Sequence, residues 1–354
     1  MHQFYILLSF LSMIFFLSCE QKAERKEEKD PVIQIQERFA GIIQKVTPSI
    51  VTILTQSKSG KTPIIFRFSE EPFPFDSETL GSGFVIKKDQ KFLYIVTNSH
   101  VVEKSKTVTV KFYNGYEKSG FIVGQDRQTD IAVLKVEIDE KIKSITPLKL
   151  GTTKNLKVGY FVISGGSPYN LGHTFTLGII SALNRNLGIS PYENYIQTDA
   201  AINPGDSGGP LLDINGNVIG MNTAIIQSGQ GLGFAIPIDT VKELSQELIK
   251  YGKVKRGWLG VLVQEIDKKM KKKLGIDHGV LVIKVFKKSP AKKSGIKTGD
   301  IILSINNVKI KDLQGMRQVI SKLKPEEKAS VEILRNRKRI LITVLIEERL
   351  DKGN

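Results

Sequence analysis

Cysteine is nearly missing from this chain of 354 residues, in which Cys19 is the only one. A single cysteine excludes an intrachain disulfide and a cysteine-rich metal site. Long apolar runs are also scarce: only residues 4–17 form one, and it is too short to span a bilayer comfortably. With few histidines and no cysteine-rich cluster, the chain implies no metal and no organic cofactor. Its length allows two or three compact units.

The positive charge is concentrated in one part of the chain. The net charge is +16, and residues 253–354 hold 26 Lys and Arg against 11 Asp and Glu, so the first 252 residues are nearly neutral. Five lysines fall within residues 268–273 and four basic residues within 335–339. Solvated charged faces are the ordinary reading, but their shared module favours acidic peptides or an anionic membrane surface. No recognition motif accompanies the charge, so we expect no nucleic-acid partner.

The N-terminus has the layout of an export signal. The apolar run of residues 4–17 fits the hydrophobic region of a signal peptide, and Cys19 ends it, just before a charged tether at residues 20–34. A cysteine in this place resembles a bacterial lipobox, although Phe16 and Leu17 are unusual before it and residues 1–10 lack Lys and Arg. The signal therefore covers residues 1–19, with lipidation at Cys19 expected and a cleaved soluble form or an uncleaved anchor left open. All three place the protein outside the cytoplasmic membrane, in the periplasm or envelope, and two of them hold it at the membrane through this anchor.

The stretch GDSGGPL at residues 205–211 places one serine in a glycine-rich loop. Glycines on both sides let the backbone turn tightly and approach a substrate carbonyl. In that geometry the N–H groups of Gly205 and Ser207 would stabilise an oxyanion, with Ser207 as the nucleophile. An ordinary turn between two strands is the alternative for a shorter G-x-S-x-G pattern.

A base and an orienting acid are found upstream, each at the end of a strand-like run. His100 ends an apolar run that begins at residue 93, and Asp130 opens another. Taken alone, such a histidine is more often structural, and such an aspartate is usually a turn residue. Together with Ser207 they predict a catalytic triad, in which His100 accepts and returns the proton and Asp130 orients the imidazole.

These motifs carry a family resemblance. TNSHVV at residues 97–102, TDIAVL at 129–134 and IQTDAAINPGDSGGP at 196–210 resemble the HtrA/Deg family of chymotrypsin-like serine proteases, and the similarity extends from about residue 35 to the C-terminus. Many short apolar runs punctuated by Gly, Asn and Asp predict an antiparallel β-barrel or sandwich. The resemblance implies a mostly β fold: two six-stranded barrels with the active site between them, at residues 35–252. The strand-like runs lie at residues 50–54, 83–86, 92–97, 107–112, 131–136, 160–164, 178–183, 218–223 and 233–236.

The resemblance also assigns residues around the site. Ile202, Ile225 and Ile226 would line a shallow apolar pocket suited to Val, Ile, Leu or Ala before the scissile bond. Arg185 falls where family members carry an arginine that relays partner binding, with an exposed barrel-edge arginine as the alternative. Asp206 stands where the family commonly has Asn. A loop at residues 57–79 with four phenylalanines either covers the site, binds a neighbouring subunit or packs on the barrel.

Residues 253–350 resemble an α+β PDZ domain of the HtrA type, through SPA at residues 289–291 and GDIILSIN at 299–306. Such a module binds a peptide C-terminus as an added strand and holds its carboxylate on backbone N–H groups. The expected carboxylate loop consists of Trp258, Leu259, Gly260 and Val261. Asp312 is expected to cap a helix over residues 313–323, and Asp239 another ending at Gly252.

We therefore expect an exported serine endopeptidase that cleaves unfolded or damaged envelope proteins and is regulated through its PDZ domain. By resemblance it would form at least a homotrimer. Two alternatives remain: a narrowly specific regulatory protease in envelope stress signalling, and a mainly binding protein acting as a chaperone or adhesin.

Overall fold

The computed structural model describes residues 30–56, 78–103, 105, 107–168, 172–188, 190, 192–225 and 231–348. The chain divides into two compact units, Met1–Gln44 and Lys45–Asn354. The signal segment with Cys19 lies outside the described residues, as do the four phenylalanines of the loop at residues 57–79. Among the helices of the described ranges, none combines the length and apolarity needed to cross a membrane.

The first helix, α2, spans Pro31–Val46. The carboxylate of Asp30 accepts a hydrogen bond from the Val32 amide (2.8 Å), and Pro31 occupies the first turn, where its missing N–H costs nothing. Pro48 lies in the short 3₁₀ turn η1 (Thr47–Ser49) that follows. The apolar side chain of Val32 is 70% exposed, so this helix presents an apolar surface.

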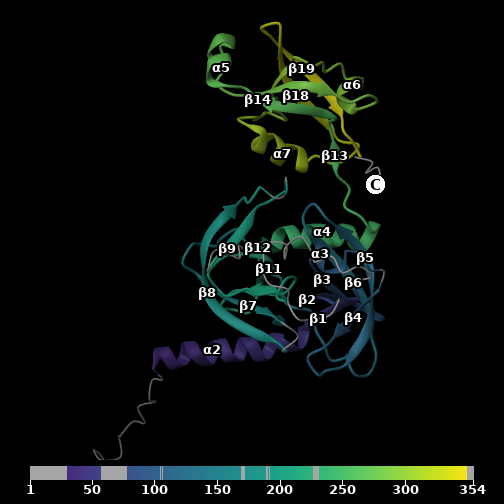
Figure 1. The fold of residues 1–354 in the computed structure, drawn as a ribbon, viewed down its shortest axis with the longest axis vertical. Coiled ribbons are helices and arrows are strands. Elements are labelled where there is room, and N and C mark those ends of the chain that lie inside the picture. Colours follow the sequence, from purple (N-terminus) through teal and green to yellow (C-terminus); the bar gives the residue numbers. More distant parts are fainter. Residues whose placement is uncertain are drawn as a thin grey trace, which may run out of the picture. The chain divides into compact units, whose positions relative to one another are not determined.

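Six antiparallel strands close the first barrel in the order β1-β2-β3-β6-β5-β4 (Figure 1). Its interior is a core of buried apolar side chains from β1, β2, β3, β4 and β6, against which the partly buried Ile122 of β5 packs. The short helix α3 (Ser99–Val102) follows β3 at the barrel's rim. The strands are β1 (Ile50–Gln56), β2 (Glu78–Lys88), β3 (Phe92–Thr97), β4 (Thr107–Lys111), β5 (Glu117–Asp126) and β6 (Ile131–Glu137).

A second closed barrel of six strands has the order β10-β11-β12-β9-β8-β7. The predicted double-barrel fold is thus confirmed, although strands β5, β9 and β10 lie in segments that the sequence did not mark as strands. The members are β7 (Phe161–Gly166), β8 (Thr174–Arg185), β9 (Tyr195–Thr198), β10 (Pro210–Leu212), β11 (Val218–Ile225) and β12 (Gly233–Pro237).

Helix α4 (Ile238–Tyr251) follows the second barrel and ends at Gly252, which has the left-handed conformation expected of a helix terminator. The prediction that Asp239 is its N-cap is wrong, because the helix already begins at Ile238. The Asp239 carboxylate instead accepts hydrogen bonds from the amide (2.8 Å) and hydroxyl (2.7 Å) of Thr153. It therefore fastens the helix to the segment that leads into the second barrel.

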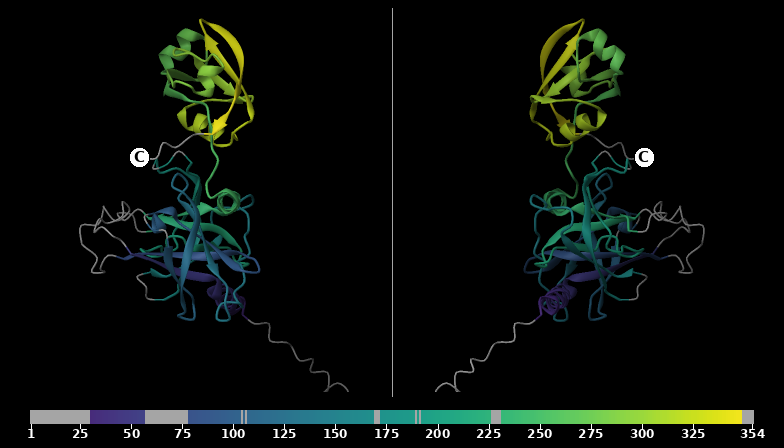
Figure 2. Two further views of the ribbon diagram at one scale, coloured as in Figure 1. Left: turned by 90° about the vertical axis from the view of Figure 1, so that its right-hand side faces the viewer. Right: turned by 90° about the vertical axis from the view of Figure 1, so that its left-hand side faces the viewer.

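The C-terminal module is a mixed unit in which β14 forms one edge of a sheet with the order β14-β15-β16-β18-β19. Figure 2 shows the β18–β19 hairpin as a long, curved ribbon. Helix α7 (Leu313–Ser321) is capped as predicted, since Asp312 accepts from the Gly315 amide (2.7 Å). The other elements are β13 (Gly257–Trp258), β14 (Val261–Glu265), α5 (Lys268–Leu274), β15 (Val280–Val285), α6 (Pro290–Lys293), β16 (Ile301–Ile305), β17 (Val308–Lys309), β18 (Lys328–Arg335), β19 (Lys338–Leu345) and β20 (Glu347–Glu348).

Candidate active site

The site is built where the two barrels meet, starting from His100. This residue lies in α3, one turn beyond the end of β3, rather than at the strand end itself as predicted. Its Nδ1 atom is 2.8 Å from Oδ2 of Asp130, and its backbone N–H donates to Oδ1 of the same carboxylate (3.0 Å). Asp130 therefore holds both the ring and the backbone of His100.

Asp130 directly precedes β6 and has a φ of 58°, in the left-handed region that few residues other than Gly, Asn and Asp adopt. Its backbone carbonyl accepts a hydrogen bond from the side-chain amide of Asn98 (2.9 Å). This contact holds the unusual conformation, which directs the carboxylate toward α3.

Thr223, in β11 of the second barrel, joins the two halves of the site. Its hydroxyl donates to Oδ2 of Asp130 (2.7 Å) and accepts from the Asn98 amide (3.2 Å). Its carbonyl accepts from the hydroxyl of Ser207 (3.3 Å). The sequence analysis did not single out Thr223 or Asn98 as site residues, because only the assembled barrels bring Thr223 against Asp130.

Charge and burial shift the pKa of His100 in opposite directions. Burial of the ring acts to lower its pKa, but the Asp130 carboxylate and its hydrogen bond outweigh this, with a further contribution from Glu103, so the pKa of His100 is raised. The side chain of His100 is still 21% exposed, so the ring remains accessible where the two barrels meet.

Residues 203–209, here called the serine loop, surround Ser207. The loop is held by Ser82 of β2, whose amide donates to the Ser207 carbonyl (2.8 Å) and whose hydroxyl donates to the Gly205 carbonyl (2.6 Å). Gly208 has a φ of 89°, and a Cβ atom there would lie 2.1 Å from the carbonyl oxygen of Ser82. Only glycine fits this position.

Two amides of the serine loop are free to bind a ligand. The N–H groups of Asp206, Gly208 and Gly209 all donate to backbone carbonyls. Within the part of the chain that the structure describes, the N–H groups of Gly205 and Ser207 donate to no other group.

The predicted substrate pocket is partly within the described residues. Ile202 is buried, and its side chain covers Gly233 of β12, where a Cβ atom would lie 2.9 Å from it. Position 225 pairs with the same glycine in the β11–β12 ladder. Ile226 lies outside the described residues, so the structure brings together two of the three predicted positions.

Arg185 lies at the exposed end of β8, where its Nε donates to the side chain of Gln197 (2.8 Å). A second arginine, which the sequence analysis did not single out, is more deeply placed. Arg256 follows α4 and pairs with Asp126 at the end of β5, with an Nη2–Oδ2 distance of 2.6 Å and both side chains at most 12% exposed. Asp126 also accepts from the Thr129 amide (3.1 Å), immediately before Asp130.

Residues 258–261 connect β13 to β14 in the C-terminal module. Gly260 has a φ of 82° and lies so close to Ser289 that a Cβ atom would be 2.2 Å from that residue's Cβ. The Leu259 side chain is buried, Trp258 packs against Phe286, and Val261 begins the edge strand β14. The N–H groups of Leu259 and Gly260 donate to no other described residue, so they are available beside an open sheet edge.

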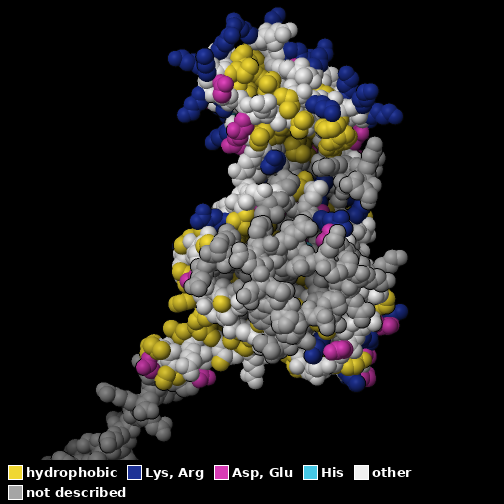
Figure 3. All heavy atoms as spheres, viewed as in Figure 1, with side chains coloured by type: hydrophobic (Ala, Val, Ile, Leu, Met, Phe, Trp, Pro, Cys, Tyr) yellow, Lys and Arg dark blue, Asp and Glu magenta, His cyan; other side chains and the backbone are white. Residues whose placement is uncertain are grey.

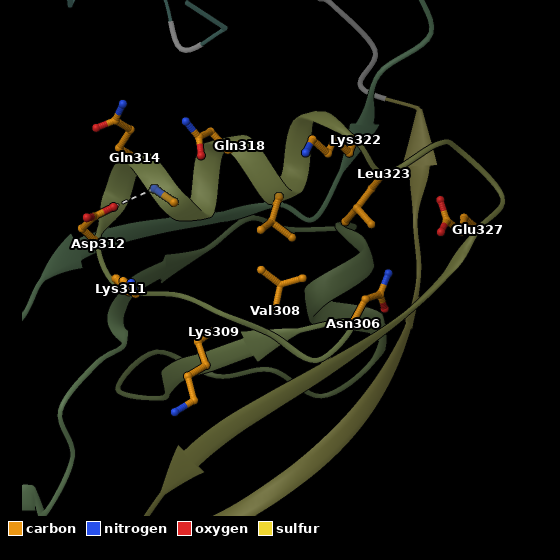
Figure 4. A pocket seen from close by; sticks show the side chains of 12 residues that line it. Asn306, Val308, Lys309, Lys311, Asp312, Gln314, Gln318, Lys322, Leu323 and Glu327 are labelled. Atoms are coloured by element: carbon orange, nitrogen blue, oxygen red, sulfur yellow. Dashed lines mark hydrogen bonds between the residues drawn. The ribbon is translucent and has the colours of Figure 1, made fainter. Parts of the chain in front are cut away.

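A groove of about 610 Å³ runs along α7 of the same module. Its lining includes Gln314, Gln318 and Lys322 of the helix together with Asn306 and Val308, and in Figure 4 the two glutamines extend from the side of the helix away from Val308. None of residues 258–261 lines this groove. Lys and Arg side chains gather over the surface of the module (Figure 3), as the charge distribution in the sequence predicted.

Comparison with known proteins agrees with this geometry. The trypsin-like peptidase domain family matches residues 81–221, and the PDZ domain family matches residues 257–346. A probable periplasmic serine endoprotease, DegP-like, from Pseudomonas putida is 39% identical over 338 residues, which cover 87% of this chain and 69% of that protein. The protein with the same description from Buchnera aphidicola is 38% identical, covering 87% of this chain and 70% of its own.

The chain belongs to the HtrA family of serine endoproteases. Solved structures of HtrA-type proteases have the same fold as this chain. The HtrA-type protease AlgW with a decapeptide superposes with a TM-score of 0.74 at 35% identity, covering 88% of this chain and 99% of that one. The serine endoprotease from Yersinia pestis has a TM-score of 0.69 at 31% identity and covers 88% of this chain and 98% of its own. This HtrA protease thus combines a trypsin-like domain with one PDZ domain in the described chain.

Proposed function

We propose that this HtrA protease cleaves peptide bonds through a triad of His100, Asp130 and Ser207. The observation that carries the proposal is the Asp130 carboxylate, which holds the imidazole of His100 by Nδ1 and leaves Nε2 for the serine. Ser207 Oγ attacks the carbonyl carbon while its proton passes to Nε2 of His100. The same proton then goes to the leaving amine, and a water molecule releases the acyl group by the reverse sequence.

The developing oxyanion would be bound by the free N–H groups of Gly205 and Ser207. Donors fixed in place before the reaction stabilise such charge without reorganising, and one is worth about 10²–10³-fold in rate. The residue before the scissile bond would lie against Ile202, Ile225 and Ile226. An apolar pocket of this kind selects a small or branched aliphatic side chain, since none of these three residues carries a charge to select Lys or Arg.

The substrates that we propose are unfolded or damaged envelope proteins. The PDZ domain would bind peptide C-termini by extending the sheet at the open edge of β14, with the terminal carboxylate at the N–H groups beside Gly260. AlgW, to which the chain is similar, has been solved with a decapeptide and with a tripeptide. Arg185 would relay peptide binding to the serine loop.

The protein would be exported, anchored at the membrane and assembled as a homotrimer. The relatives described above are named periplasmic, and export with a membrane anchor at Cys19 would place this protein in the same compartment. A homotrimer is supported by apolar side chains that remain exposed, including Val32 and Ile35 on α2 and Phe161 and Leu177 on the second barrel.

The test is hydrolysis of an unfolded, casein-like protein by the wild type and by two serine variants. Ser207→Ala removes the nucleophile, whereas Ser321→Ala removes an exposed hydroxyl that bonds only within α7 (2.8 Å to the Gln318 carbonyl). We expect cleavage by the wild type and Ser321→Ala and none by Ser207→Ala. Steady turnover by Ser207→Ala would reject the triad, and cleavage only after addition of a peptide with an apolar C-terminus would favour a regulatory protease.

A further inference from the structure

The residue before the candidate nucleophile carries a buried carboxyl group that the reaction does not use. Asp206 is 4% exposed. Its Oδ2 atom accepts one hydrogen bond, from the Asn203 amide (2.8 Å), and its Oδ1 atom finds no hydrogen-bond partner among the described residues. Oδ1 lies against Gly166, where a Cβ atom would be 2.3 Å from it.

Among the described residues, the groups that pack around this carboxyl group are neutral. The end of β7 contributes Gly166 and Ser167, whose buried hydroxyl also lacks a partner among the described residues. Asn222 of β11 and Ser82 of β2 contact the backbone of the serine loop, not the carboxyl group.

Two titratable side chains of neighbouring segments are engaged elsewhere. Asp199 accepts from the Ile179 amide (2.7 Å), and His173, before β8, hydrogen-bonds to the backbone of Ile50. Neither of them, nor any other charged side chain of the described chain, contributes to the pKa of Asp206.

We propose that Asp206 is a positioning residue of the serine loop, and that the loop keeps its catalytic geometry only while the Asp206 carboxyl group carries a proton. A buried carboxylate with one donor and no cation is unfavourable, and it gains by moving toward water or a positive charge. The backbone of Asp206 lies between Gly205 and Ser207, so a movement of its side chain displaces the two amides assigned to the oxyanion.

The electrostatics of the site agree with this reading. Burial raises the pKa of Asp206 to about 6, and the hydrogen bond from Asn203 offsets only part of the effect. The carboxyl group therefore changes charge within a pH range in which a periplasmic enzyme works. Asparagine, which resembles the protonated form in shape and keeps an oxygen for Asn203, removes the titration.

The proposal rests on the proposed function, since it assumes that the Gly205 and Ser207 amides serve the reaction. The experiment measures kcat/KM between pH 5 and 9 on a quenched peptide with a valine before the cleaved bond. The proteins are the wild type, Asp206→Asn, Asp206→Ala and Asp213→Asn. Asp213 is the matched control, because it is a partly exposed turn aspartate whose Oδ1 accepts from the amides of Asn215 (2.8 Å) and Asn217 (2.9 Å).

Asp206, with a pKa of about 6, ionises before His100, whose pKa is raised, loses its proton. We therefore expect the rate of the wild type and Asp213→Asn to stop rising near pH 6 and to show a falling limb once both groups have titrated. Asp206→Asn should keep only the rising limb, so its rate relative to wild type grows by about tenfold per pH unit beyond the Asp206 transition. Asp206→Ala should be slower than Asp206→Asn at every pH, because it lacks the Asn203 bond, and should also lack the falling limb. Unfolding midpoints of all four proteins confirm that each is folded.

The positioning role is overturned if the falling limb persists in both Asp206 variants, if Asp213→Asn loses it equally, or if the wild type shows none up to pH 9. A failure of the proposed function looks different. In that case Ser207→Ala hydrolyses the peptide as fast as the wild type, and the positioning role is rejected with it.

Discussion

Thr223 offers the sharpest test of how the site is assembled, because one hydroxyl from the second barrel supports the acid of the first. Thr223→Val keeps the volume of the side chain, which is 2% exposed, and removes its hydrogen bond to Oδ2 of Asp130. Asn98 is not left without a partner, since its amide still donates to the Asp130 carbonyl. The substitution therefore removes the contacts of one hydroxyl: the hydrogen bond to Asp130 and the longer one from Asn98 (3.2 Å).

The magnitude follows from the charge on the acceptor. A hydrogen bond to a charged group contributes about 1.5–3 kcal/mol, and each ~1.4 kcal/mol is a factor of about ten in rate. If most of this interaction supports the imidazolium formed in the transition state, kcat/KM falls by about ten- to a hundredfold.

The pH dependence of activity tests the same hydrogen bond in a second, independent way. Loss of a donor leaves the charge of Asp130 less compensated, so the pKa of His100, already raised by Asp130, rises further. His100 must be neutral to accept a proton, hence activity increases as the pH rises through its pKa. Both limbs are compared in the Asp206→Asn background, which lacks the second titration. There the rising limb should lie above the ordinary histidine pKa of about 6.5, and Thr223→Val should move it to still higher pH.

The assay is kcat/KM on the quenched peptide across this pH range. Thr55→Val is the control, since Thr55 is also buried and its hydroxyl donates to a backbone carbonyl, that of Val101 (3.4 Å), rather than to a carboxylate. We expect it to leave the limb in place. An unmoved limb in Thr223→Val, or an equal loss of rate in Thr55→Val, would refute the reasoning.

Two further predictions concern the frame of the site. Gly208→Ala should lower labelling of Ser207 by a fluorophosphonate at least a hundredfold, because its φ of 89° and the nearby carbonyl exclude a Cβ atom; normal labelling would contradict it. Arg256→Met should lower the free energy of unfolding by about 3–5 kcal/mol, since it leaves a buried carboxylate unpaired. Lys253→Met breaks an exposed pair and should cost less than about 1 kcal/mol in the same denaturant titration, and equal losses would refute the comparison.

Local patterns predicted much of this structure. The serine loop could be found because its glycines are needed for backbone positions that only glycine adopts, as Gly208 shows. The apolar runs that became β3 and β6 were visible because both strands are almost wholly buried. The double barrel itself came from the family resemblance, since alternation alone allowed a sandwich as well.

What could not be predicted depends on contacts between distant segments. Strand β5 was missed because Gly120 and Gly124 interrupt its pattern, yet a Cβ atom on Gly120 would lie 2.8 Å from Val110, so the glycine is a packing requirement. Thr223 was missed for a related reason. Its role comes from a contact with a residue 93 positions earlier, which no periodicity encodes.

The two aspartates of the site differ in the hydrogen bonds that their carboxyl groups receive, which also depend on contacts between distant segments. Asp130 receives three hydrogen bonds on its carboxylate, two from His100 and one from Thr223, so its negative charge is compensated within the site. Asp206 receives one, from Asn203, in a buried position without a cation. Two residues of one type are thus suited to opposite states, a charged group that stabilises an imidazolium and a neutral group that holds a loop. Because donors decide which state each adopts, adding a donor or a cation beside Oδ1 of Asp206 should favour its charged form, lower its pKa and move the loss of activity to lower pH.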